Sequence, residues 1–210
     1  MKTLLLAGLS AVLTTIPGLA APISALTFTG NAVNGTAATT TRGYAFNVTL
    51  AGIWATHLSI WDLGGDGLAQ SHDVGLWDPI GNLIASANVP TGTAAPILDG
   101  FRFVDIPDVA LPVGSGYTVG ALLLNGSADG QARDLVNSAA APGISIVGGR
   151  FINNGVASLT RPTTPFSNGL VGGSLLVDTL AAPVPEPGSI GLIGLGVAAL
   201  GYARRRTRAV

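Results

Sequence analysis

The chain has 210 residues, of which 48% are hydrophobic and only 10% are charged, and it contains 30 glycines, 13 prolines and no cysteine. This composition favours one domain of short strands and turns, and the lack of cysteine excludes disulfides, thiolate zinc sites and thiol catalysis. Residues 21–184 contain five arginines, ten aspartates and no lysine or glutamate, and this formal charge of −5 disfavours nucleic-acid binding.

Residues 1–20 have the pattern of a secretory signal peptide. Lys2 supplies a positive charge, residues 4–16 are mainly apolar, and Gly18 and Ala20 are the small residues that signal peptidase accepts at its cleavage site. We therefore predict that signal peptidase cuts between Ala20 and Ala21. The alternative is that this segment forms a buried N-terminal helix of the domain.

Residues 21–180 show apolar residues at alternate positions, in short runs, without helical periodicity. The run 44–50 would bury one face of a strand, made of Tyr44, Phe46, Val48 and Leu50. Further strands are predicted at 58–61, 101–104 and 117–123, with weaker candidates at 144–152 and 175–180. We expect an all-β domain, an antiparallel β-sandwich of jelly-roll or immunoglobulin-like type with about seven to nine strands.

The clearest hairpin joins residues 74–77 to residues 82–85. The intervening Asp78-Pro79-Ile80-Gly81 has Asp, Pro and Gly at the positions that suit a type I turn, and Gly81 can adopt a left-handed conformation. The glycine-rich segment before this hairpin carries Asp62, Asp66 and Asp73. Carboxylates on a flexible loop suit Ca²⁺, the one cofactor that we consider, although the spacing is not that of an EF-hand. The alternative is that they are solvated turn residues.

Few residues could perform catalysis. His57 and His72 are the only histidines, and the chain has no Gly-x-Ser-x-Gly motif, so we expect no enzymatic activity. The chain has three tryptophans, Trp54, Trp61 and Trp77. They could stack on sugar rings if two of them shared an exposed sheet face, and the alternative is that they pack within the domain. Arg150 and Arg161 are isolated in the sequence and belong to no motif.

Residues 181–210 have three parts. Residues 181–188 contain prolines at positions 183, 185 and 187, which exclude regular helix and predict a stiff linker. Residues 189–203 carry no charge, and as a helix they would span about 23 Å, so they are a marginal transmembrane helix. The tail 204–210 carries Arg204, Arg205, Arg206 and Arg208. These arginines predict that the C-terminal end of the membrane helix lies in the cytoplasm.

The order of Pro185-Glu186-Pro187, a short apolar helix and an arginine cluster resembles the PEP-CTERM sorting signal of Gram-negative bacteria. The resemblance implies that an exosortase, a membrane-embedded protease, recognises the Pro-Glu-Pro motif, removes the helix and releases or transfers the protein to the envelope or matrix. It also implies an association with exopolysaccharide. A similar C-terminal segment is named after the ice-binding proteins that carry it. A plain membrane anchor is the alternative.

Residues 46–123 also resemble an uncharacterised β-sandwich module of exported bacterial proteins, through the blocks 57–62, 65–68, 74–78 and 112–117. That resemblance implies no activity. The sequence therefore predicts an exported, non-enzymatic protein with an inner-membrane precursor and a final place in the cell envelope or outside the cell. The alternatives are a secreted carbohydrate-binding module and a hydrolase with an unrecognised site.

Overall fold

The computed structural model describes residues 21–33, 38–153, 155–167 and 169–179. The chain divides into two units, Met1–Thr179 and Leu180–Val210, and every described residue belongs to the first. The predicted signal segment, Pro-rich linker, membrane helix and arginine tail lie outside the described residues. Within the described ranges, no helix is long and apolar enough to cross a membrane.

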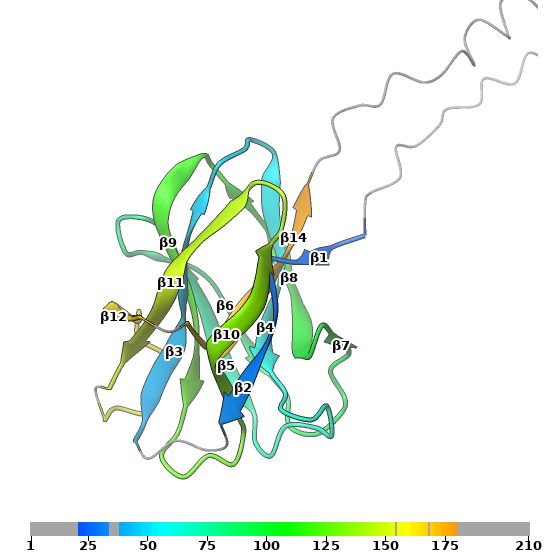
Figure 1. The fold of residues 1–210 in the computed structure, drawn as a ribbon, viewed down its shortest axis with the longest axis vertical. Helices are drawn as coiled ribbons and strands as arrows, with labels where there is room; N and C mark the ends of the chain where they lie inside the picture. The colour runs from blue at the N-terminus through cyan, green and yellow to red at the C-terminus, as the bar shows by residue number, and fades with distance from the viewer. Residues whose placement is uncertain (1–20, 34–37, 154, 168, 180–210) are drawn as a thin grey trace, which may run out of the picture. The chain divides into compact units, whose positions relative to one another are not determined.

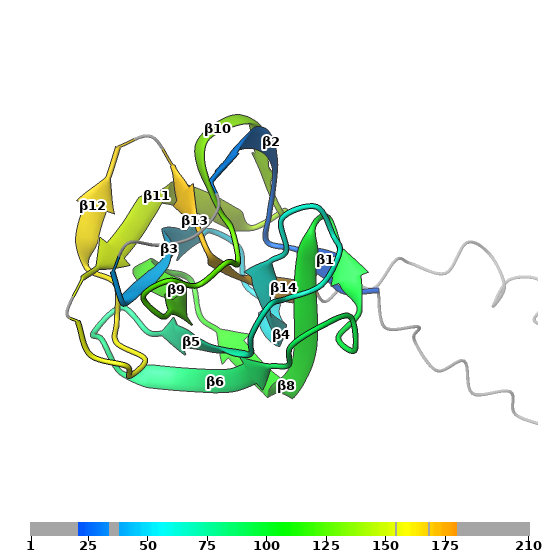
Figure 2. The same cartoon turned by 90° about the horizontal axis from the view of Figure 1, so that it is seen from below.

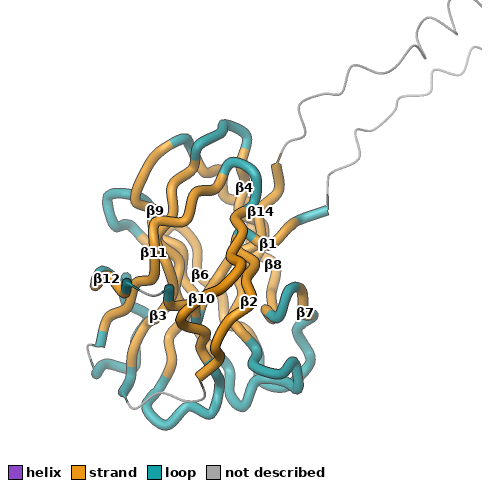
Figure 3. The backbone as a smooth tube through the Cα atoms, in the orientation of Figure 1, coloured by secondary structure: helices purple, strands orange, loops and turns teal. Residues whose placement is uncertain are grey.

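The described residues form strands and loops (Figure 3), which confirms the predicted all-β fold. Their strand pairs are antiparallel. One sheet has five strands, in the order β1 (Ile23–Ser24), β14 (Gly173–Thr179), β4 (Ile53–Trp61), β8 (Phe101–Leu111) and β7 (Ile97–Leu98). A second has six, in the order β12 (Thr164–Phe166), β11 (Ile144–Ile152), β3 (Thr40–Val48), β9 (Gly114–Leu123), β5 (His72–Trp77) and β6 (Leu83–Val89). A third has three, in the order β13 (Leu170–Val171), β10 (Gln131–Ala140) and β2 (Leu26–Val33).

The five-stranded and six-stranded sheets face each other as a sandwich (Figure 1). Strands β4 and β14 of the first pack against β5, β9 and β3 of the second. The view in Figure 2 shows that the three-stranded sheet closes one side of the sandwich and that β6 meets β8 on the other. The three-stranded sheet therefore creates a boundary with β11 and β3, and this boundary positions the clefts described below.

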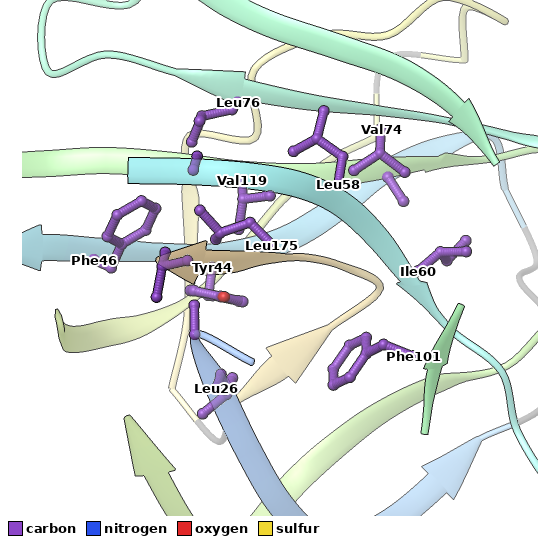
Figure 4. Packing of buried hydrophobic residues seen from close by; sticks show 14 of the residues in the cluster. Leu26, Tyr44, Phe46, Leu58, Ile60, Val74, Leu76, Phe101, Val119 and Leu175 are labelled. Carbon is purple, nitrogen blue, oxygen red and sulfur yellow. The ribbon is translucent and has the colours of Figure 1, made fainter. Parts of the chain in front are cut away.

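The core fills the space between the two main sheets (Figure 4). Tyr44, Phe46 and Val48 are buried as the alternation on β3 predicted, whereas Leu50 lies beyond the end of the strand and is 56% exposed. The Tyr44 hydroxyl lies 2.9 Å from Ser174 Oγ on β14 and so bridges the two sheets. Burial raises the pKa of Tyr44, which keeps this bridging group neutral.

The predicted hairpin is formed by β5 and β6. The amide of Gly81 donates to the Asp78 carbonyl at 3.0 Å, and Gly81 has a φ of 100°, a conformation that favours glycine. The Asp78 carboxylate also accepts the backbone and side-chain N–H groups of Asn82, at 2.8 and 2.9 Å. Desolvation opposes their effect, but these hydrogen bonds and those from Gly81 and Ile80 together lower the pKa of Asp78. The turn is thus fixed by both backbone and side chain.

Candidate functional site

His57 on β4 lies between two polar groups. Its Nε2 atom is 2.6 Å from Asp105 Oδ1, and its Nδ1 atom is 2.8 Å from Thr56 Oγ1. His57, Phe103 and Asp105 border a shallow pocket of about 250 Å³. Hydroxyl, imidazole and carboxylate are the components of a hydrolytic triad, but a triad keeps its carboxylate buried, and the Asp105 side chain is 91% exposed. The geometry is therefore poor for catalysis.

His72 on β5 is paired inside the protein, where its side chain is 1% exposed and that of Asp129 is 6% exposed. The Nδ1 atom lies 2.9 Å from the Leu122 carbonyl and Nε2 lies 2.6 Å from Asp129 Oδ2, so both ring nitrogens face acceptors. Asp129 also accepts the N–H groups of Ala69 and Gln70. This pair joins three segments and is closed to substrate.

The three predicted calcium ligands are engaged separately. Asp62 is buried, and its Oδ2 atom lies 2.6 Å from Arg102 Nε, while Asp73 accepts the side-chain amide of Asn88 at 2.8 Å and Asp66 is exposed. In the part of the chain that the structure describes, no group of three or more histidines, cysteines and acidic residues could hold a metal ion. The calcium site stays a prediction that the described geometry does not favour, because Asp62 is already paired with the buried guanidinium of Arg102.

The tryptophans pack within the domain. Trp77 is 4% exposed, and Trp61 lies in an aromatic cluster with ring centroids 4.8 Å from Phe28 and 5.4 Å from Phe101. Trp54 is half-buried on β4. Trp61 and Trp77 are thus used for packing, and they do not form the exposed sugar platform that was one interpretation of the sequence.

Two arginines that we did not select from the sequence line one cleft of about 230 Å³, which we call the arginine cleft. Its lining residues come from both sides of the boundary with the three-stranded sheet: Arg42, Gln131, Arg133, Phe151, Asn153 and Phe166. Arg42 donates through Nη1 to the Gln131 side-chain carbonyl and through Nε to Thr40 Oγ1. Burial, and secondly the charge of Arg133, lower the pKa of Arg42. The cleft therefore concentrates positive charge in an acidic domain.

The arginine cleft adjoins a larger one of about 510 Å³, because Arg42 lines the first and Tyr44, the next residue on the same face of β3, lines the second. Arg133 and Phe166 line the first, and Asp134 and Ser167 line the second. In Figure 2, β13 lies between β10 and β11, the strands that contribute most of this lining. The two clefts follow the boundary between the three-stranded and six-stranded sheets.

Arg150 and Arg161, which are isolated in the sequence, also come together. They border a separate hollow of about 240 Å³ with Thr118 and Thr163. The guanidinium groups are engaged by backbone carbonyls, Arg150 with Gly149 at 2.8 Å and Arg161 with Gly116 at 3.0 Å. Arg150 pairs with Gly43, next to Arg42 in β3, so it points to the opposite face of the sheet. It therefore provides a matched control for Arg42.

Comparison with known families gives a match outside the β-domain. Residues 183–206 match the family model of the PEP-CTERM protein-sorting motif. The chain carries a PEP-CTERM sorting motif. The match includes Pro185, Glu186 and Pro187 and extends to Arg206, whereas Arg208 lies beyond it. No curated protein matches the chain, and no solved structure does.

The PEP-CTERM motif supports an exported protein that an exosortase, a membrane protease, processes. The β-domain ends at β14, which is hydrogen bonded to β1 on one side and β4 on the other. The segment that leads to the PEP-CTERM motif therefore follows a strand anchored on both sides. Ile23 pairs with Val177, so the strands nearest the two ends of the domain are neighbours.

Proposed function

We propose that the protein is a non-enzymatic component of the cell surface or extracellular matrix, associated with exopolysaccharide and delivered by its sorting motif. The observation that carries the proposal is the match of residues 183–206 to the PEP-CTERM motif. Signal peptidase cuts after Ala20, and the precursor is held in the inner membrane by residues 189–203, with Arg204 to Arg208 on the cytoplasmic side. Exosortase then acts at Pro185-Glu186-Pro187.

The β-domain supports a structural role outside the cell. It has no cysteine, so it must keep its loops in place without disulfides. The pairs Asp62–Arg102 and His72–Asp129 hold the loop 62–71 at both ends, and its Leu68 forms a β-bridge with Gly92. Arg102 also donates to the Gly65 carbonyl at 3.0 Å. Because of these contacts, the loop 62–71 should stay closed against the domain more firmly than its glycines alone would predict.

The test is the intact mass of the protein recovered outside the inner membrane. The expected species begins at Ala21 and lacks residues 189–210. The Glu186→Ala variant should stay in the membrane fraction as a precursor, whereas Pro183→Ala, a matched change outside Pro-Glu-Pro, should be processed. If the wild-type protein outside the membrane still contains residues 189–210, the tail is a plain anchor and the proposal fails.

Association with exopolysaccharide requires a separate test. In cells that lack the polysaccharide, the processed protein should appear in the medium and be lost from the surface. Unchanged retention would contradict the association but leave the processing step intact.

A hydrolase is the second candidate, and it would use Thr56, His57 and Asp105, which have the order of a hydrolytic triad although the Asp105 side chain is 91% exposed. An ester and glycoside activity screen with the wild-type chain and the His57→Gln variant decides this question. Activity that disappears in His57→Gln would replace the non-enzymatic proposal, because a structural histidine would change stability without abolishing turnover.

A further inference from the structure

Arg42 occupies a position normally given to an apolar residue. It lies in phase with Tyr44 and Phe46 on β3, both of which are buried between the sheets. The Arg42 side chain is half-buried, and its hydrogen bond to Gln131 joins β3 to β10 across the arginine cleft. A cation placed inside a protein loses hydration, and this loss is costly unless an anion compensates it.

No carboxylate supplies that compensation within the described ranges. Among the ion pairs there, none involves Arg42, and the partner of Arg133 is Asp134 with a separation of 3.9 Å. The Arg133 and Asp134 side chains are 50% and 42% exposed, so this contact is weak. Arg102, by contrast, lies 2.6 Å from the buried carboxylate of Asp62. The cleft thus has the cations of an ion-pair site without its anion.

The other lining residues indicate which anion would fit. Gln131 and Asn153 carry amides that can donate to and accept from hydroxyl groups. Phe151 and Phe166 are half-buried with ring centroids 6.2 Å apart, and they give the cleft apolar walls. Arginine binds carboxylates in a planar, two-point arrangement. Amides, aromatic rings and guanidinium groups together suit a sugar ring that bears a carboxylate.

We propose that the arginine cleft binds a uronate unit of an acidic polysaccharide, with Arg42 and Arg133 holding the carboxylate and Gln131 and Asn153 the hydroxyls. The choice of a polysaccharide as the carrier rests on the proposed association with exopolysaccharide. The volume of about 230 Å³ is enough for about one sugar ring. The glycan continues along the adjoining cleft, where Tyr44, Ser138 and Ser167 contribute lining.

The net charge of the domain limits the kind of polymer. With five arginines against ten aspartates in residues 21–184, the surface repels a densely charged chain such as nucleic acid. A polysaccharide with widely spaced carboxylates can present one of them to the cleft without that repulsion. Binding should therefore weaken as salt rises from 50 to 500 mM, because the arginine–carboxylate attraction is screened.

The experiment is calorimetric titration of the purified full-length chain in mild detergent, which does not depend on processing. The probes are a trisaccharide with one glucuronate unit and the same trisaccharide with glucose in that place. The glucuronate probe should bind at least about tenfold more tightly, as expected for a charge-assisted hydrogen bond. Acetate at the same concentration should not displace it.

Two variants locate the site without disturbing the core. Arg133→Gln removes a half-exposed guanidinium and should weaken binding by about tenfold. Asp134→Asn removes the carboxylate that competes for Arg133 and should strengthen binding by about threefold. Asparagine tolerates the φ of 53° at this position, so the fold is preserved. Arg150→Gln, on the opposite face of the sheet, should leave affinity unchanged.

Three results would overturn the proposal. They are equal affinity for the two trisaccharides, equal effects of Arg133→Gln and Arg150→Gln, and displacement by acetate as efficient as by the sugar. A chain that binds glucuronate but keeps residues 189–210 outside the membrane would overturn the sorting proposal alone. A chain that is processed but does not bind the glucuronate probe would overturn the uronate-binding proposal alone.

Discussion

Two regions of the domain bring charged side chains out of water in opposite ways. Around the loop 62–71, each buried carboxylate faces a buried nitrogen group, Asp62 with the guanidinium of Arg102 and Asp129 with the imidazole of His72, both at 2.6 Å. In the arginine cleft, Arg42 is half-buried beside a second cation, Arg133. In the first region each buried polar group has its partner inside the protein. In the second, the guanidinium groups lie at a cleft where a ligand can reach them.

This difference separates structural charges from binding charges. A buried ion pair supports stability only while both partners are present, because the loss of either one leaves an uncompensated buried charge. The loop 62–71 was expected to be flexible from its glycines, and these pairs are the reason that it is held. A cation such as Arg42, which has no carboxylate partner among the described residues, can interact with an anionic ligand, and its removal should affect binding more than folding. The predictions below test this separation.

The largest effect should come from Arg102→Met. The change leaves Asp62 buried without its cation and removes donors to the Ala95 and Gly65 carbonyls. We expect the free energy of unfolding to fall by about 3–5 kcal/mol. Urea unfolding of the full-length chain in mild detergent measures it.

The control for this prediction is Arg150→Met, which should change the free energy of unfolding by less than about 0.5 kcal/mol. The double variant Arg102→Met with Asp62→Leu should recover most of the loss, because no lone charge remains. A loss as large in the double variant as in Arg102→Met would mean that the pair itself is not the cause.

Asp129→Asn should have a smaller effect. The variant removes the carboxylate that faces His72, but an imidazole, unlike a guanidinium, has a neutral form, so the change need not leave a lone buried charge. The N–H groups of Ala69 and Gln70 donate to Oδ1 and Oδ2 of Asp129, and asparagine keeps only one of these two oxygens, so one amide loses its acceptor. We therefore expect a loss of about 2 kcal/mol in the same unfolding measurement. A loss as large as that of Arg102→Met would show that the imidazole cannot adapt.

Arg42→Met should cost less again, within about 1 kcal/mol, if the comparison between the two regions is correct. The change removes the hydrogen bond to Gln131 but also removes a cation that has no carboxylate partner in the described residues. Glucuronate binding should nevertheless be lost. A stability loss equal to that of Arg102→Met would show that Arg42 stabilises the fold in the way that Arg102 does and is not kept for binding.

Much of the fold was predictable, because alternation and turn chemistry act locally. The strand 144–152 was placed at its observed bounds, and the hairpin at Asp78 to Gly81 forms as expected. Strand β8 was predicted over 101–104 but runs on to Leu111 through Pro107, because the pairing with β4 shifts register beside that proline. Strands β2 and β10 were missed, since both are interrupted by polar or small residues and β10 pairs irregularly with β2.

The sorting motif was predictable, because its signal is the order of residues along the chain. The arginine cleft was not predicted, since it combines Arg42 with residues about ninety positions further along, such as Arg133. One signal was nevertheless present: Arg42 falls on the buried face of its strand, two residues before Tyr44. The calcium interpretation stays a prediction, and the spacing on which it rests did not reveal that Arg102 pairs with Asp62.

The smallest expected effect concerns calcium, and it tests whether the loop 62–71 depends on its own charges alone. If Asp62, Asp66 and Asp73 shared an ion with a dissociation constant near 10 μM, 1 mM Ca²⁺ would stabilise the fold by about 2.7 kcal/mol. Because Asp62 is committed to Arg102, we expect the midpoint of thermal unfolding to be the same in 1 mM Ca²⁺ and in chelator. A rise with Ca²⁺ that disappears in Asp66→Asn would show that the loop rearranges to bind the ion, and the contrast between a self-satisfied loop and an open cleft would then be lost.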